Sequence, residues 1–85
     1  MDELAQLKWQ CRRGTKELDF LLNRYLEAGY WVADQGERAL FVELLKFEDD
    51  QLIGVLMGDL EVRGMEVLAG KVRALAVAGV YRMFN

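Results

Sequence analysis

Apolar residues recur every three or four positions along most of this 85-residue chain, a period typical of helices with one buried face. The clearest stripe lies in residues 15–28, and a shorter one precedes it in residues 3–12. Gly14 separates them, and glycine readily breaks a helix. The pattern therefore predicts two amphipathic helices with a short corner between them. Their predicted buried residues are Leu4, Leu7, Cys11, Leu18, Leu21, Leu22, Tyr25 and Leu26.

Aromatic residues lie at the ends of these two helices. Trp9 falls outside the apolar stripe of the first helix. Packing across the next turn is the default expectation for it, and exposure to a partner is the alternative. Gly29 is expected to cap the second helix. Tyr30 and Trp31 follow in the connection, where we expect them to cover the end of the core.

A third helix is predicted from a capping signal. Asp34 followed by Glu37 is a capping-box pattern, with an acceptor at the cap and a carboxylate at the third helical position. The helix is expected over residues 35–47. Its predicted buried residues are Leu40, Phe41, Leu44 and Leu45.

Two further helices are predicted in the second half of the chain. Asp49 or Asp50 is expected to cap a short fourth helix that Gly58 closes. A fifth helix is expected from about residue 62 onward, interrupted by Gly64 and Gly70. The predicted buried residues are Leu52, Ile53, Leu56, Met57, Met65, Ala69, Val72, Leu75 and Ala76.

The fold class that follows is all-α, a small single-domain bundle of four to five short helices over residues 1–85. No strand-like alternation persists anywhere, and the chain contains no proline. Residues 74–85 form an unusually apolar tail. We expect this tail to extend the fifth helix and pack on the bundle, with an exposed patch for a partner or for self-association as the alternative.

Composition excludes most kinds of independent chemistry. The chain has no histidine, so it lacks the commonest general base and the commonest metal ligand. Its single cysteine forms no internal disulfide and no zinc site. A net charge of −3 argues against nucleic-acid binding. No signal peptide and no apolar run of about 20 residues is present, so we expect a cytoplasmic protein without membrane insertion.

One stretch remains as a candidate site, the corner around Gly14. Arg12 and Arg13 offer guanidinium groups suited to carboxylate or phosphate recognition. Glu17 lies in the first turn of the second helix, where a carboxylate also favours the helix dipole. Asp19 lies in the same turn region, within reach of Lys16 or Arg12 as an ion-pair partner. Each residue taken singly is explained by helix structure, but together they indicate a docking site at an exposed corner.

This stretch resembles a known family motif. Residues 9–19 read Trp-x-Cys-Arg-Arg-Gly-x-x-Glu-Leu-Asp. They are similar to the extended Arg-Gly-x-x-Glu motif of the succinate dehydrogenase flavinylation factors, the SdhE family. The resemblance covers about residues 7–57 and includes the stretch from Phe47 to Leu52. Two departures are the absence of a proline near Asp50 and of a tryptophan near Val55.

The resemblance implies a five-helix protein that binds the flavoprotein subunit of succinate dehydrogenase or fumarate reductase. It implies that the protein promotes covalent attachment of FAD to a histidine of that subunit. The protein is then expected to be no enzyme, to hold no cofactor or metal of its own, and to be a monomer or weak homodimer. Glu17 is expected to orient active-site residues of the partner, with assistance of proton transfer as the alternative. The expected partner-binding residues are Arg12, Arg13, Gly14, Glu17, Asp19, Asp49 and Asp50.

Two other functions remain open at this point. One is a small helical adaptor or antitoxin-type binding module unrelated to flavin. The other is a nucleic-acid binder that uses Lys8, Arg12, Arg13 and Lys16, although the acidic composition argues against it.

Overall fold

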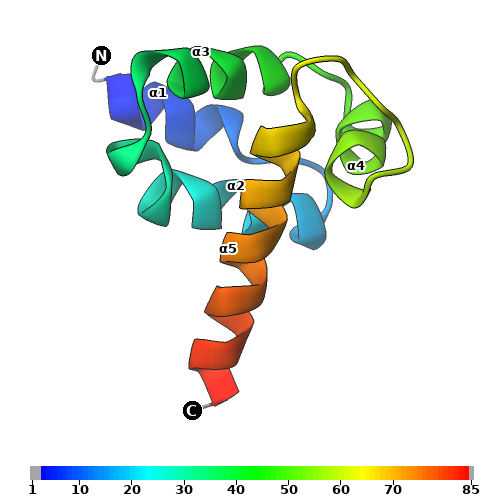
Figure 1. Cartoon of the computed structure of the whole chain (residues 1–85). Coiled ribbons are helices and arrows are strands. Elements are labelled where there is room, and N and C mark those ends of the chain that lie inside the picture. The colour runs from blue at the N-terminus through cyan, green and yellow to red at the C-terminus, as the bar shows by residue number, and fades with distance from the viewer. Residues whose placement is uncertain (1–2, 85) are drawn as a thin grey trace.

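The computed structural model describes residues 3–84, with side chains to residue 79, and it is all-α over that range. Five α-helices and one 3-10 turn occur, and residues 3–84 contain no strand. Figure 1 shows α5 running past the centre of the bundle, with its last turns extending beyond the other helices. The elements are α1 (Glu3–Gln10), α2 (Lys16–Ala28), η1 (Tyr30–Val32), α3 (Gln35–Leu44), α4 (Asp49–Met57) and α5 (Glu66–Phe84).

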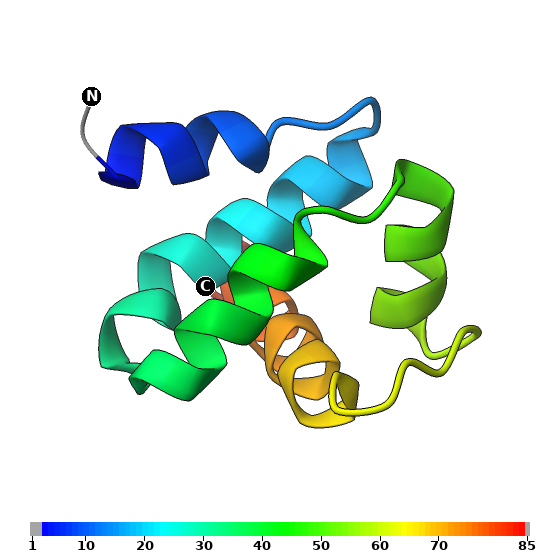
Figure 2. The ribbon, with the colours of Figure 1, turned by 90° about the horizontal axis from the view of Figure 1, so that it is seen from above.

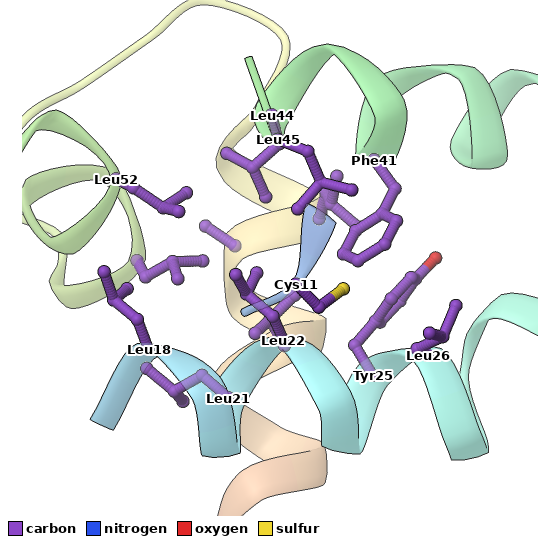
Figure 3. Close-up of a cluster of buried hydrophobic side chains, with 14 of the residues drawn as sticks. Cys11, Leu18, Leu21, Leu22, Tyr25, Leu26, Phe41, Leu44, Leu45 and Leu52 are labelled. Carbon is purple, nitrogen blue, oxygen red and sulfur yellow. The ribbon is translucent and has the colours of Figure 1, made fainter. Parts of the chain in front are cut away.

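The core forms around the apolar face of α2, as the sequence period predicts. The five residues expected on that face are all buried, and Leu18, Leu22 and Tyr25 have no exposed surface. The Tyr25 ring lies 4.6 Å from the ring of Phe41 between centroids, which packs α3 against α2. Figure 3 shows these side chains converging from several helices on one apolar cluster.

The capping predictions are confirmed in part. The Asp34 carboxylate accepts a hydrogen bond of 2.8 Å from the Glu37 amide and so caps α3. The Glu37 side chain does not complete the box, because it accepts from the Tyr25 hydroxyl at 2.6 Å and pairs with Lys71. A long-range ion pair and a buried hydroxyl therefore replace the local contact.

The prediction that Asp49 or Asp50 caps α4 is wrong. Glu48 occupies the cap position, and its amide donates to Gln51 at 3.3 Å. Asp49 and Asp50 are the first two helical residues. Three consecutive acids all suit a helix start, so the sequence pattern did not separate them.

Two predicted core residues are exposed instead. Leu40 precedes Phe41, and neighbouring helix positions are turned by about 100°, so Leu40 faces outward when Phe41 enters the core. Met57 ends α4 and is 48% exposed. Val55 and Leu68 are buried in their place. The third helix also ends at Leu44, before the predicted residue 47.

The fifth helix begins later than predicted and extends through most of the apolar tail. Gly58 and Gly64 have φ values of 87° and 89°, which only glycine adopts easily, and they shape the turn before Glu66. Ala76 and Gly79 are still buried, and the Arg24 side chain lies across Gly79. The helix extension is confirmed to Phe84, while residue 85 lies outside the described residues. Within residues 3–84, no helix combines the length and apolarity needed to cross a bilayer.

Candidate partner-binding site

The corner between α1 and α2 lies against the start of α4, and Figure 2 shows this approach from above. Arg13 makes the connection, since its guanidinium turns inward and only 14% of its side chain is exposed. It donates to the Leu45 carbonyl, donates to the Phe47 carbonyl at 3.3 Å, and forms an ion pair of 3.5 Å with Asp49. Arg13 therefore ties the corner to the α3–α4 connection.

Asp49 completes the tie from the other side. One carboxylate oxygen faces Arg13, and the other accepts a hydrogen bond of 3.0 Å from the Gly14 amide. A Cβ atom at position 14 would lie 3.2 Å from that second oxygen. Gly14 has a negative φ, so glycine serves here for close approach of the carboxylate. The group that lies against Gly14 is therefore the Asp49 carboxylate of this protein itself.

Asp19 also acts within the corner. Its carboxylate accepts a hydrogen bond from the Arg13 amide, rather than pairing with the Lys16 or Arg12 side chain as the sequence suggested. Thr15 caps α2 by accepting from the Leu18 amide at 3.2 Å. The main chain and the side chain of Arg13 are therefore both held in place.

Cys11 lies beneath the corner as predicted. It is fully buried, and Figure 3 shows it among Leu22, Tyr25 and Phe41. Burial raises the pKa of the Cys11 thiol to about 11, and the charge of Arg13 offsets this only in part. The thiol is protonated at neutral pH and is a packing group.

A second group of corner residues faces solvent. Arg12, Glu17 and Asp50 are exposed, and their side chains make no hydrogen bond or ion pair with any side chain or carbonyl in the described part of the chain. Trp9 is 70% exposed, so the expectation that it packs across the next turn is wrong. The corner therefore presents a cation, carboxylates and an aromatic ring to the outside.

The structure thus brings together the predicted residues but divides them by role. Arg13, Asp19 and Asp49 form internal contacts, whereas Arg12 and Glu17 have free charged groups. The sequence does not predict that Arg13 bonds to the Leu45 and Phe47 carbonyls, because no side-chain pattern indicates a main-chain acceptor. Arg13 is also one of the four basic residues considered for nucleic-acid binding, and its charge is turned inward.

No metal-binding arrangement occurs in the range the structure covers. Residues 3–84 hold no cluster of three or more cysteine, aspartate or glutamate side chains placed to share an ion. What the geometry offers is a rigid charged corner, supported from beneath by an apolar core. The fold and the site together define a small all-α protein with a charged corner on its surface.

Comparison with known proteins assigns the family. Residues 5–74 match the family model described as flavinator of succinate dehydrogenase. The chain is 46% identical over 56 residues to the FAD assembly factor SdhE of Xylella fastidiosa strain 9a5c, covering 66% of this chain and 58% of that protein. It is 40% identical over 77 residues to the FAD assembly factor SdhE of Methylococcus capsulatus strain Bath, covering 88% and 93%. The chain therefore belongs to the family of succinate dehydrogenase flavinators.

Proposed function

We propose that this protein is an assembly factor that binds the flavoprotein subunit of succinate dehydrogenase and promotes covalent attachment of FAD to it. Membership of the flavinator family supports this function, as do relatives named FAD assembly factor. The chain has no histidine, so a histidyl linkage to flavin forms on the partner. FAD is accordingly held by the flavoprotein, and this protein keeps no cofactor of its own.

The main structural support for this proposal is that some charged residues of the corner bond within the protein while others face solvent. Arg13 and Asp49 fix the main chain around Gly14, so the free side chains of Arg12 and Glu17 project from a rigid support. A charged group on a rigid support loses little conformational freedom when it binds. This arrangement suits a contact that orients groups on another protein.

Orientation is also the role we propose for Glu17. Attachment of flavin through its 8-methyl group requires loss of a proton and development of negative charge on the ring, which favours a preorganised site with little water. Glu17 is exposed, whereas such a site lies inside the flavoprotein. Glu17 therefore acts by pairing with a cation of the partner and holding the flavoprotein in its competent arrangement.

The protein acts in the cytoplasm as a monomer or weak homodimer, and it accepts the flavoprotein of fumarate reductase as well as that of succinate dehydrogenase. It performs no catalysis by itself. The adaptor or antitoxin alternative predicts a stable partner other than these flavoproteins.

The test is co-expression of the flavoprotein with Glu17→Ala, reading covalent flavin by fluorescence in a denaturing gel. Glu43→Ala is the matched control, because Glu43 is 58% exposed on α3 and, among the described residues, its one ion pair is a surface contact with Lys46. We expect Glu17→Ala to lower the fluorescence severalfold and Glu43→Ala to leave it unchanged. Full fluorescence with a folded Glu17→Ala protein would rule out the proposed role of Glu17.

A further inference from the structure

An apolar hollow of about 260 Å³ lies where α2, α4 and α5 meet, directly beside the motif carboxylate. Among the residues whose side chains the structure describes, Glu17 is the only charged one in its lining. The volume falls below the roughly 300–1,000 Å³ typical of small-molecule pockets, so a side chain of another protein fits it better than a free ligand. The lining residues are Glu17, Phe20, Leu21, Met57, Ala76 and Val77.

Large apolar side chains of this hollow remain exposed to solvent. Phe20 is 39% exposed, Met57 is 48% exposed and Val77 is 55% exposed. They come from three different helices, so the fold gathers them at one place. Contiguous exposed apolar surface with a charged edge is characteristic of interaction sites.

The hollow is continuous with the charged corner. Phe20 and Leu21 follow Glu17 by three and four residues, which places all three side chains on one face of α2. Val77 and Ala76 lie beyond residues 5–74, the part matched by the family model. The side of the hollow formed by α5 therefore lies outside the Arg-Gly-x-x-Glu motif and outside the range matched by the family model.

We propose that this hollow binds an apolar side chain of the flavoprotein that has a basic residue next to it, and that the basic residue pairs with Glu17. This inference rests on the proposed function. The choice of occupant rests on charge complementarity. Within residues 3–79, the lining contains one carboxylate, that of Glu17, which has no side-chain partner, and it contains no cation. Met57 contributes a flexible wall that adapts to the incoming side chain.

A second copy of this chain fits the hollow less well. An isologous pairing places the same surface on both sides of the interface. It brings two Glu17 carboxylates to one apolar contact with no described cation to compensate them. Juxtaposed like charges oppose association, so the chemistry favours a different, basic partner.

The first experiment changes the apolar wall. Val77→Glu places a charge in the hollow, and Val67→Glu makes the same change on the same helix at a residue that is 72% exposed and outside the hollow. The affinity of each purified variant for the FAD-loaded flavoprotein subunit is measured by calorimetry, with the unfolding midpoint as a folding control. We expect Val77→Glu to weaken binding roughly tenfold or more and Val67→Glu to change it less than about twofold.

The second experiment tests the basic residue of the occupant. Wild-type affinity should fall as salt increases, and Glu17→Gln should reduce that dependence because the exposed ion pair is gone. An unchanged salt dependence in Glu17→Gln would overturn this part of the proposal.

The outcomes separate the two proposals. If the wild-type protein does not bind the flavoprotein, the proposed function fails. If the wild-type protein binds and Val77→Glu binds equally well, the function stands and the hollow is not the contact. A wild-type dimer in sedimentation that Val77→Glu dissociates, with flavoprotein binding unaffected, would assign the hollow to self-association and overturn the proposal.

Discussion

Arg12 and Arg13 are neighbours in sequence and identical in chemistry, yet the fold gives them opposite positions. Arg13 turns inward to two carbonyls and Asp49, whereas the exposed side chain of Arg12 makes no hydrogen bond or ion pair with the described part of the chain. The same division separates Asp19 from Glu17 on α2. A motif of adjacent charged residues can thus contain both the support of a site and its contact groups.

The largest expected effect comes from removing the support. Arg13→Ala removes the hydrogen bonds to the Leu45 and Phe47 carbonyls and the ion pair with one carboxylate oxygen of Asp49. We expect a loss of about 2–3 kcal/mol in the free energy of unfolding, since each of these contacts involves a charged donor. Arg12→Ala should change it by less than about 0.5 kcal/mol. Urea unfolding of both variants checks this, and equal losses would remove the distinction between the two arginines.

A smaller effect is expected for the two aspartates at the start of α4. Asp49→Asn weakens the ion pair with Arg13 and the hydrogen bond from the Gly14 amide. Asp50→Asn removes the same charge from the same helix turn without either contact, so the difference between the variants isolates the corner. We expect the free energy of unfolding of Asp49→Asn to be about 1 kcal/mol lower than that of Asp50→Asn, measured by thermal or urea unfolding. Indistinguishable variants would show that Asp49 does not hold the corner.

Cys11 provides a local probe of the same support. Its burial raises the pKa of the thiol to about 11, so a thiol reagent at pH 8 should react slowly with the folded protein and rapidly after denaturation. Arg13→Ala should increase the labelling rate under native conditions, because the corner above Cys11 opens more often. Arg12→Ala is the control and should label at the wild-type rate. Rapid labelling of the wild-type protein would contradict the buried position.

The smallest effect concerns Glu37, a partnered carboxylate that contrasts with Glu17. Its pKa is lowered, first by the hydrogen bond from Lys71 and then by that from the Tyr25 hydroxyl. A carboxyl whose pKa is lower in the folded state stabilises the protein above its unfolded pKa of about 4.3, and that contribution is lost as pH falls further. Glu37→Gln should therefore flatten the acid side of the stability profile. Lys71→Met should reproduce much of this change. If stability varied with pH in both variants as it does in the wild type, the hydrogen bond between Lys71 and Glu37 would not be the cause of the acid dependence.

The sequence predicted the parts of the fold that depend on local periodicity. The buried face of α2, the Asp34 cap and the close of α4 at Gly58 all follow from residues within a few positions of one another. The partners of Glu37 did not follow, because Lys71 is 34 residues away and only the packing of α5 brings it near.

The site was predicted in location but not in its division of roles. The residues around Gly14 were identified from their composition and from the family resemblance. The inward turn of Arg13 depends on main-chain carbonyls that the end of α3 exposes, and the hollow beside Glu17 depends on three helices meeting. Both are tertiary features without a local signal. The exposed position of Trp9 was missed because packing is the usual state of a tryptophan.

Glu17 is a contact residue, and the support formed by Arg13 and Asp49 does not depend on it. The most direct test measures the affinity of Glu17→Gln for the FAD-loaded flavoprotein subunit together with its free energy of unfolding. We expect a free energy of unfolding within about 0.5 kcal/mol of the wild type and binding that is roughly tenfold weaker or more, because a charge-assisted contact is lost. A Glu17→Gln protein that binds the flavoprotein as tightly as the wild type would show that Glu17 is not a contact residue.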